Sequence, residues 1–105
     1  MIQLTQEQKN GWLVVSVRGR ADAEAADELE NGLTNALEVS SKVAADLSAL
    51  DYISSAGLRA VLQAARAAQT RHAEFAVCRL SAPARKVFDM SGVHQILKIH
   101  GELPC

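Results

Sequence analysis

The sequence predicts an α/β domain, a single layered fold in which a mixed sheet of about five strands is packed with helices in the order β-β-α-β-α-β-α-β. Near the N-terminus, an Asn-Gly dipeptide separates a segment that alternates apolar and polar residues from a run rich in β-branched residues, which is typical of a hairpin. After it, short runs of apolar residues alternate with longer segments whose apolar residues recur every three or four positions. This alternation favours parallel strands joined by helices. With 105 residues, 49% of them hydrophobic, the chain is expected to form one domain, 1–105.

The first two strands are expected at residues 2–8 and 12–18. Ile2 and Leu4 alternate with polar residues, and the β-branched run that starts at Trp12 predicts a more buried second strand. Asn10-Gly11 suits a turn in which both central residues have positive φ. The segment 19–22 then ends the strand, and its last residue, Asp22, can accept hydrogen bonds from the amides of a first helical turn.

Two helices and a central strand follow. The apolar spacing predicts a helix over residues 23–39, and acidic side chains crowd its N-terminal half. Residues 42–47 form a short apolar run typical of a central strand, and residues 48–53 are expected to form a loop. A second helix is expected to begin within residues 54–58 and to end at about Arg71. Its buried side holds Leu58, Val61, Leu62, Ala65 and Ala68, and its outer side holds Arg59, Gln63, Arg66 and Thr70.

The C-terminal part adds a strand at residues 74–80, a short helix at 84–90 and a last strand at 96–99. Pro83 suits the first turn of that helix and Gly92 suits its end. Cys78 lies in an apolar run and is expected to be a small buried side chain. Cys78 and Cys105 show neither a disulfide framework nor a metal-ligand spacing.

Composition argues against several classes of function. The net charge is −1, and the chain has no dense basic run and only four aromatic residues, so direct nucleic-acid binding is not expected. There is no signal peptide and no apolar stretch of membrane-spanning length, which favours a cytoplasmic protein without membrane contact. The three histidines lack a ligand spacing and there is no glycine-rich phosphate loop, so neither metal nor cofactor is expected. The Gly-x-Ser-x-Gly motif of a hydrolase nucleophile elbow requires glycine at the position of Ile53, so the chain is not expected to be an enzyme. The enzymatic alternative is a small hydrolase that uses Ser55 as its nucleophile.

The segment Asp46–Leu58, with the sequence DLSALDYISSAGL, resembles the signature of STAS domains (sulfate transporter and anti-sigma factor antagonist). In that family a central strand ends in Asp-Leu-Ser, and a loop leads to a Ser-Ser-Ala-Gly-Leu type segment that opens a helix. Gly19–Asp22 and Phe88–Val93 resemble two further motifs of the family. The order of elements agrees as well, so the resemblance covers nearly the whole chain.

The resemblance implies an anti-sigma factor antagonist. In stand-alone members, the serine that corresponds to Ser55 is phosphorylated by an anti-sigma factor with serine/threonine kinase activity. The unphosphorylated form binds that partner, the phosphorylated form releases it, and a PP2C-type phosphatase resets the switch. Ser54 stands where an acidic residue is common, which makes Ser54 the alternative phosphorylation site. The alternative function is an accessory STAS subunit of a transport or sensory complex that does not act on a sigma factor.

The residues themselves supply a physical argument for Ser55. A phosphoryl group at a helix N-terminus is tolerated by the domain, whereas the same charge buried under a docked partner weakens binding. Serine is also a preferred N-cap, so capping alone would explain the pair. Asp22 either borders this site or only caps a helix. Asp46 is expected to fix the loop by accepting hydrogen bonds from backbone amides. The arginines of the second helix are either solvated or face an acidic partner. The residues expected to contact the partner are Asp22, Asp51, Tyr52, Ser54, Ser55, Ala56, Gly57, Arg59, Gln63 and Arg66.

Overall fold

The computed structural model describes residues 1–93 and 98–100. Their five strands form one sheet in the order β1-β2-β3-β4-β5, in which the first pair is antiparallel and the other pairs are parallel. The predicted fold class and element order are therefore confirmed. Residues 96 and 97 of the predicted last strand lie outside the described residues. The elements are β1 (Ile2–Lys9), β2 (Trp12–Ala21), α1 (Ala26–Val39), β3 (Lys42–Ile53), α2 (Ser55–Thr70), β4 (Glu74–Cys78), α3 (Ala82–Ser91) and β5 (Lys98–His100).

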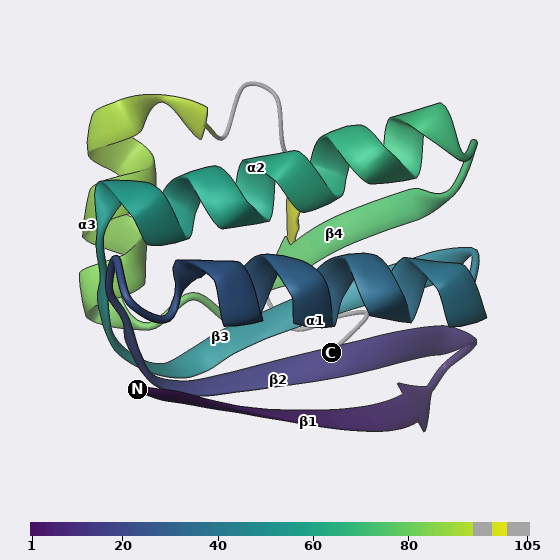
Figure 1. Ribbon diagram of the computed structural model, residues 1–105, viewed down its shortest axis with the longest axis horizontal. Helices are drawn as coiled ribbons and strands as arrows, with labels where there is room; N and C mark the ends of the chain where they lie inside the picture. The colour runs from purple at the N-terminus through teal and green to yellow at the C-terminus, as the bar shows by residue number, and fades with distance from the viewer. Residues whose placement is uncertain (94–97, 101–105) are drawn as a thin grey trace.

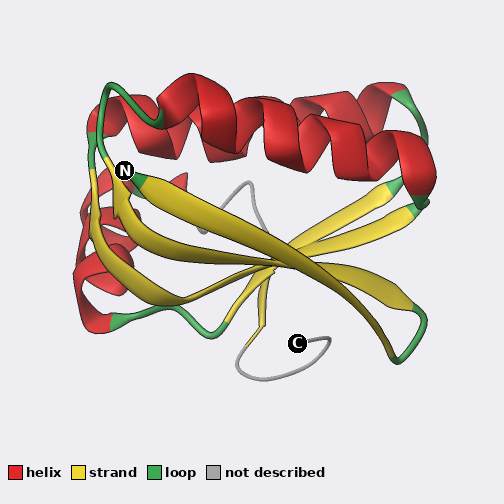
Figure 2. Ribbon diagram, turned by 60° about the horizontal axis from the view of Figure 1, so that its bottom comes forward, coloured by secondary structure: helices red, strands yellow, loops and turns green. Residues whose placement is uncertain are grey.

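Helices α1 and α2 lie side by side on one face of the sheet (Figures 1 and 2). Both helices begin at the edge where β2 and β3 end, as expected for parallel strands joined by crossover helices. Helix α3 lies at the end of the molecule where α2 begins (Figure 1). The main core lies between the helices and the sheet. It includes Val15 and Val17 of β2, Leu47 of β3, Leu33 of α1 and Phe88 of α3.

The N-terminal hairpin forms as predicted. Asn10 and Gly11 both have positive φ, 55° and 84°, which is the backbone geometry expected of an Asn-Gly turn. The second strand is longer than predicted, because it continues past Arg18 to Ala21. Gly19 allows this extension: its φ is 104°, and a Cβ atom there would lie 2.6 Å from the Met1 carbonyl oxygen. Only glycine lets β1 and β2 stay paired at this point.

The predicted loop at residues 48–53 is wrong, because β3 runs without interruption to Ile53. Its pairing with β2 shifts twice. Ser16 pairs with Asp46 but Arg18 with Ala49, and Gly19 pairs with Leu50 but Arg20 with Tyr52. At each shift β3 has one residue more than β2, which is the pattern of a β-bulge. The two extra residues break the alternation of polar and apolar side chains by which a strand is recognised in a sequence.

The helix boundaries differ from the predictions by a few residues. Helix α1 begins at Ala26 instead of residue 23, because the preceding residues form a turn in which the Ala25 amide donates to the Asp22 carbonyl oxygen. Helix α2 agrees with its prediction, although Leu62 and Ala65 are half-buried and Gly57, Ala60 and Ala64 join its buried side. Helix α3 is longer than predicted at both ends, with Ser81 as N-cap and Gly92 as left-handed C-cap. Strand β4 ends at Cys78, which is buried.

Candidate functional site

The two serines singled out by the sequence lie where β3 passes into α2. Ser54 has an extended backbone and is the N-cap of the helix. Its Oγ accepts a hydrogen bond from the Gly57 amide at 3.1 Å and donates one to the Ala21 carbonyl oxygen, also at 3.1 Å. The Ser54 amide donates to the same oxygen at 2.9 Å. Ser54 therefore joins the end of β2 to the start of α2, and its hydroxyl is used by the fold.

Ser55 is in the opposite situation. It is the first residue of α2 and is exposed, and its hydroxyl makes no hydrogen bond within the described part of the chain. The first turn of α2 contains no acidic residue. The unpaired amides and the dipole of a helix N-terminus favour an anion at this position. The Ser55 hydroxyl is thus accessible to another protein and lies where added negative charge is tolerated.

Close packing fixes this helix start in place. Gly57 is buried against the end of β2, and a Cβ atom on Gly57 would lie 2.5 Å from the Ala21 carbonyl oxygen and 3.1 Å from the Ala21 Cβ. A larger residue would push α2 away from the sheet. The glycine of the Ser-Ser-Ala-Gly segment therefore has a packing role, and the half-buried Ala56 lies between it and Ser55.

Asp22 lies next to this junction, because it directly follows Ala21. Its Oδ1 accepts a hydrogen bond from the Ala25 amide at 3.0 Å, so it stabilises the turn that precedes α1. Its Oδ2 lies 3.8 Å from the N-terminal ammonium group, and its side chain is 33% exposed. The two interpretations of Asp22 are therefore compatible: it caps a turn and still presents a carboxylate at the end of the molecule where α2 begins.

Asp51 and Tyr52 are both exposed, and both belong to β3. Tyr52 pairs in register with Arg20 of β2, and the guanidinium carbon lies 4.4 Å from the centre of the tyrosine ring. This cation–π pair forms an exposed platform on the strands that lead to the two serines. Sequence reasoning missed Arg20, because the pairing depends on the second register shift of β3 and has no signal in the local sequence.

The other predicted contact residues lie along α2. Arg59 is exposed one turn after Ser55, and Arg66 is exposed two turns further on. Gln63, between them, is half-buried. Acidic side chains are exposed at the start of the neighbouring helix α1, including Asp27 and Glu28 in its first turn. The helix-covered face of the molecule therefore presents negative charge on α1 beside positive charge on α2.

Asp46 has the structural role that the sequence predicts. It is 9% exposed, and its Oδ1 accepts a hydrogen bond from the Ser48 amide at 3.0 Å, across the first bulge of β3. Its Oδ2 lies 3.7 Å from Nε of Arg79, and Arg79 also donates to the Ser48 hydroxyl at 3.4 Å. The carboxylate thus stabilises the irregular part of the strand that leads to Ser54 and connects it to the segment after β4.

Within residues 1–93 and 98–100, no three His, Cys, Asp or Glu side chains are grouped so that they could hold a metal ion. Among the helices that the structure describes, none is long and apolar enough to cross a membrane.

Comparison with known proteins gives consistent results. The model of the STAS domain family matches residues 3–103. A protein of Bordetella bronchiseptica named "Putative anti-sigma factor antagonist BtrV" is 34% identical over 99 residues, which cover 93% of this chain and 85% of that protein. The crystal structure of an anti-sigma factor antagonist from Mycobacterium paratuberculosis superposes with a TM-score of 0.82 at 24% identity, over 98% of this chain and 88% of that one. The Bacillus protein SpoIIAA in its phosphorylated form gives a TM-score of 0.72 at 19% identity, over 99% and 93%. These two structures share the fold of this chain.

Proposed function

The chain belongs to the STAS domain family, and from this premise we propose that it acts as an anti-sigma factor antagonist. Two relatives in sequence carry that description in their names: BtrV, and the anti-sigma F factor antagonist of Paenibacillus polymyxa, which is 26% identical over 101 residues. The observation that carries the proposal is the division of roles between two adjacent serines. The Ser54 hydroxyl is hydrogen-bonded within the fold, whereas the exposed Ser55 hydroxyl forms no hydrogen bond with any residue that the structure describes.

The proposed mechanism is a partner switch. The unphosphorylated protein binds an anti-sigma factor that is also a serine/threonine kinase. In the complex, Oγ of Ser55 attacks the γ-phosphorus of ATP, the bond to the leaving ADP breaks, and the hydroxyl proton passes to a base of the kinase. The phosphorylated protein is then released, and a PP2C-type phosphatase hydrolyses the phosphoester. In this mechanism the chain is a substrate and a binding partner, and it needs neither catalysis, nor a cofactor, nor contact with nucleic acid. The role requires a cytoplasmic location, where ATP and sigma factors are found.

The position of Ser55 explains how a single phosphate controls binding. The phosphoryl group adds about −1.5 to −2 charges at pH 7. At the first residue of α2 it faces helix amides and no acidic side chain of the first turn, so the domain tolerates it. A partner docked over Ser55 would have to bury that charge. If this costs about 3 kcal/mol, the affinity falls about a hundredfold without any change in fold.

We propose that the contact surface is centred on Ser55. It includes Asp22, which precedes α1, Asp51 and Tyr52 near the end of β3, and Arg59, Gln63 and Arg66 along α2. Ser54 and Ala56 are half-buried at its centre, and the buried Gly57 supports it by packing against Ala21. The surface holds both signs of charge, and we therefore expect the partner to present an acidic patch toward α2 and a basic patch toward α1.

Phosphorylation of the full-length protein by its cognate anti-sigma kinase tests the proposal. After incubation with the kinase and ATP, peptide mass spectrometry is expected to find the phosphate on Ser55. The Ser55→Ala variant is expected to bind the kinase without being modified, and Ser55→Asp is expected to bind it more weakly. Ser54→Ala is the matched control and is expected to remain phosphorylated at Ser55. A phosphate on Ser54 alone would contradict the residue assignment. Stable association with transport or sensory subunits, without any kinase, would contradict the function.

A further inference from the structure

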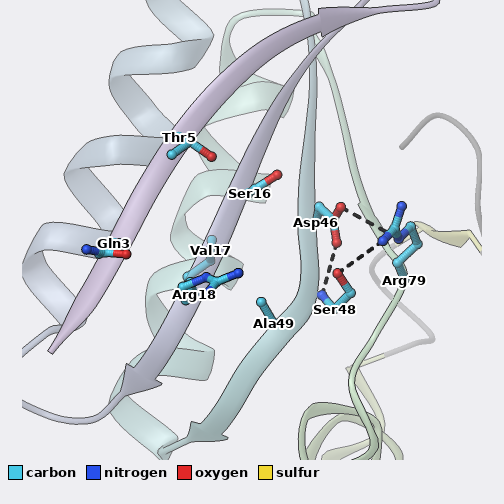
Figure 3. A pocket seen from close by; sticks show the side chains of 9 residues that line it. All are labelled: Gln3, Thr5, Ser16, Val17, Arg18, Asp46, Ser48, Ala49 and Arg79. Atoms are coloured by element: carbon cyan, nitrogen blue, oxygen red, sulfur yellow. Dashed lines mark hydrogen bonds and ion pairs between the residues drawn. The ribbon is translucent and has the colours of Figure 1, made fainter.

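A cavity of about 340 Å³ lies on the sheet face opposite α1 and α2. Figure 3 shows its lining across β1, β2 and β3 and the segment that follows β4. Its charged side chains are Arg18, Asp46 and Arg79, and its uncharged polar side chains are Gln3, Thr5, Ser16 and Ser48. Residues of β2 and β3 that alternate with them, such as Val15 and Leu47, belong to the core under the helices. The volume is within the range of about 300–1,000 Å³ that is usual for small-molecule sites.

The two arginines of this cavity lie on either side of one small residue. Arg18 pairs in register with Ala49 of β3, and on the other side Arg79 donates to the hydroxyl of the neighbouring Ser48 (Figure 3). Ala49 is half-buried, and its methyl group leaves room above the strand between the two guanidinium groups. A ligand group placed over Ala49 therefore approaches both arginines.

The charges of the lining do not cancel. Among the lining residues that the structure describes, Asp46 is the one acidic residue, and it already interacts with Arg79 and with the Ser48 amide. Arg18 is exposed and forms no ion pair with any residue that the structure describes. The cavity thus holds two guanidinium groups and one carboxylate. Its net positive charge is carried by Arg18, while Asp46 holds Arg79 in position.

We propose that this cavity binds a small organic anion. A carboxylate or phosphate group would lie over Ala49 and accept hydrogen bonds from Arg18 and Arg79, because guanidinium groups bind such oxyanions through paired, charge-assisted hydrogen bonds. Hydroxyl groups of the ligand would contact Ser16 and Thr5 on the neighbouring strands. The proposal is independent of the proposed function, because neither its residues nor its sheet face includes Ser55.

Nuclear magnetic resonance titration of the ¹⁵N-labelled full chain tests the site. The probes are citrate for a carboxylate source and glycerol 3-phosphate for a phosphate source, at constant ionic strength. We expect one of them to shift the amide resonances of Arg18, Ser48 and Ala49 in a saturable way. Loss of a charge-assisted hydrogen bond in Arg18→Gln is expected to weaken that binding about tenfold. Arg85→Gln, an exposed arginine of α3 outside the cavity, is the matched control and is expected to bind as the wild type does.

Three results would overturn the site. The first is the absence of saturable shifts with either anion. The second is an equal loss of binding in Arg85→Gln, which would indicate a general charge effect. The third is that sodium chloride at the same ionic strength reproduces the shifts. Thermal unfolding of both variants is the check that each is folded, so that a loss of binding in Arg18→Gln can be separated from unfolding.

Discussion

Replacing each of the two adjacent serines by alanine should have very different effects on stability. Ser54→Ala removes the cap bond to the Gly57 amide, and loss of a serine cap costs about 1 kcal/mol. It also removes the hydroxyl bond to the Ala21 carbonyl oxygen, which keeps its bond from the Ser54 amide, so this second loss adds up to about 1 kcal/mol. We therefore expect Ser54→Ala to lower the free energy of unfolding by about 1–2 kcal/mol. Ser55→Ala removes an exposed hydroxyl that has no hydrogen-bond partner among the described residues, and it should change the free energy of unfolding by less than about 0.5 kcal/mol.

Urea denaturation followed by circular dichroism measures both values. In thermal unfolding, each kcal/mol should appear as a shift of about 4–8 °C in a domain of this size. Ser54→Gly is a useful third variant, because glycine is a better N-cap than alanine and should recover part of the loss. The reasoning fails if Ser54→Ala is as stable as the wild type, or if Ser55→Ala is destabilised as much as Ser54→Ala. Either outcome would mean that the two serines do not divide the structural and the exposed role as described.

Three further substitutions test the packing that supports the site. Gly57→Ala places a methyl group 2.5 Å from the Ala21 carbonyl oxygen and should cost about 1–3 kcal/mol in urea denaturation, whereas an unchanged midpoint would show that α2 is not held against β2. Phe88→Ala empties a fully buried position and should lower the free energy of unfolding by about 3–5 kcal/mol, whereas replacing Met90, 79% exposed on the same helix, by alanine should be nearly neutral. Similar losses of stability in the two variants would contradict the position of α3. Asp46→Ala removes a carboxylate that accepts from the Ser48 amide and should cost about 1.5–3 kcal/mol, with Asp46→Asn recovering part because its amide oxygen still accepts; equal losses would show that the bulge does not depend on this bond.

The sequence was sufficient for those parts of the fold that depend on local rules. The Asn10-Gly11 turn was predictable because its backbone has positive φ at both residues, and α2 was predictable because its apolar residues keep helical spacing over 16 residues. The second half of β3 was not predictable. Its two extra residues shift the polar and apolar positions out of alternation, and only pairing with β2 shows that the segment is a strand.

The candidate site shows the same division. Serines before a helix indicated a cap and an exposed hydroxyl, but which serine had which role depended on the Ala21 carbonyl oxygen, 33 residues away in the chain. The stacking of Arg20 on Tyr52 also depends on contacts between distant segments. The hydrogen bond that Asp46 accepts from a backbone amide was predictable, because its partner Ser48 is only two residues away in the chain. Local partners were predictable, and partners brought together by the sheet were not.

The hairpin at Asn10-Gly11 has a practical value for following the protein in binding assays. Strand β2 begins at this turn and ends beside Ser54, so the turn and the proposed contact surface are at opposite ends of its ten residues. Both turn residues are exposed, and a Cβ atom added to Gly11 would meet no atom of the described residues within 4 Å. A fluorescent dye attached to a cysteine introduced at Asn10 would therefore report on tumbling without touching a bound partner. A fusion at Met1 would instead crowd Asp22, whose carboxylate lies 3.8 Å from the terminal ammonium group.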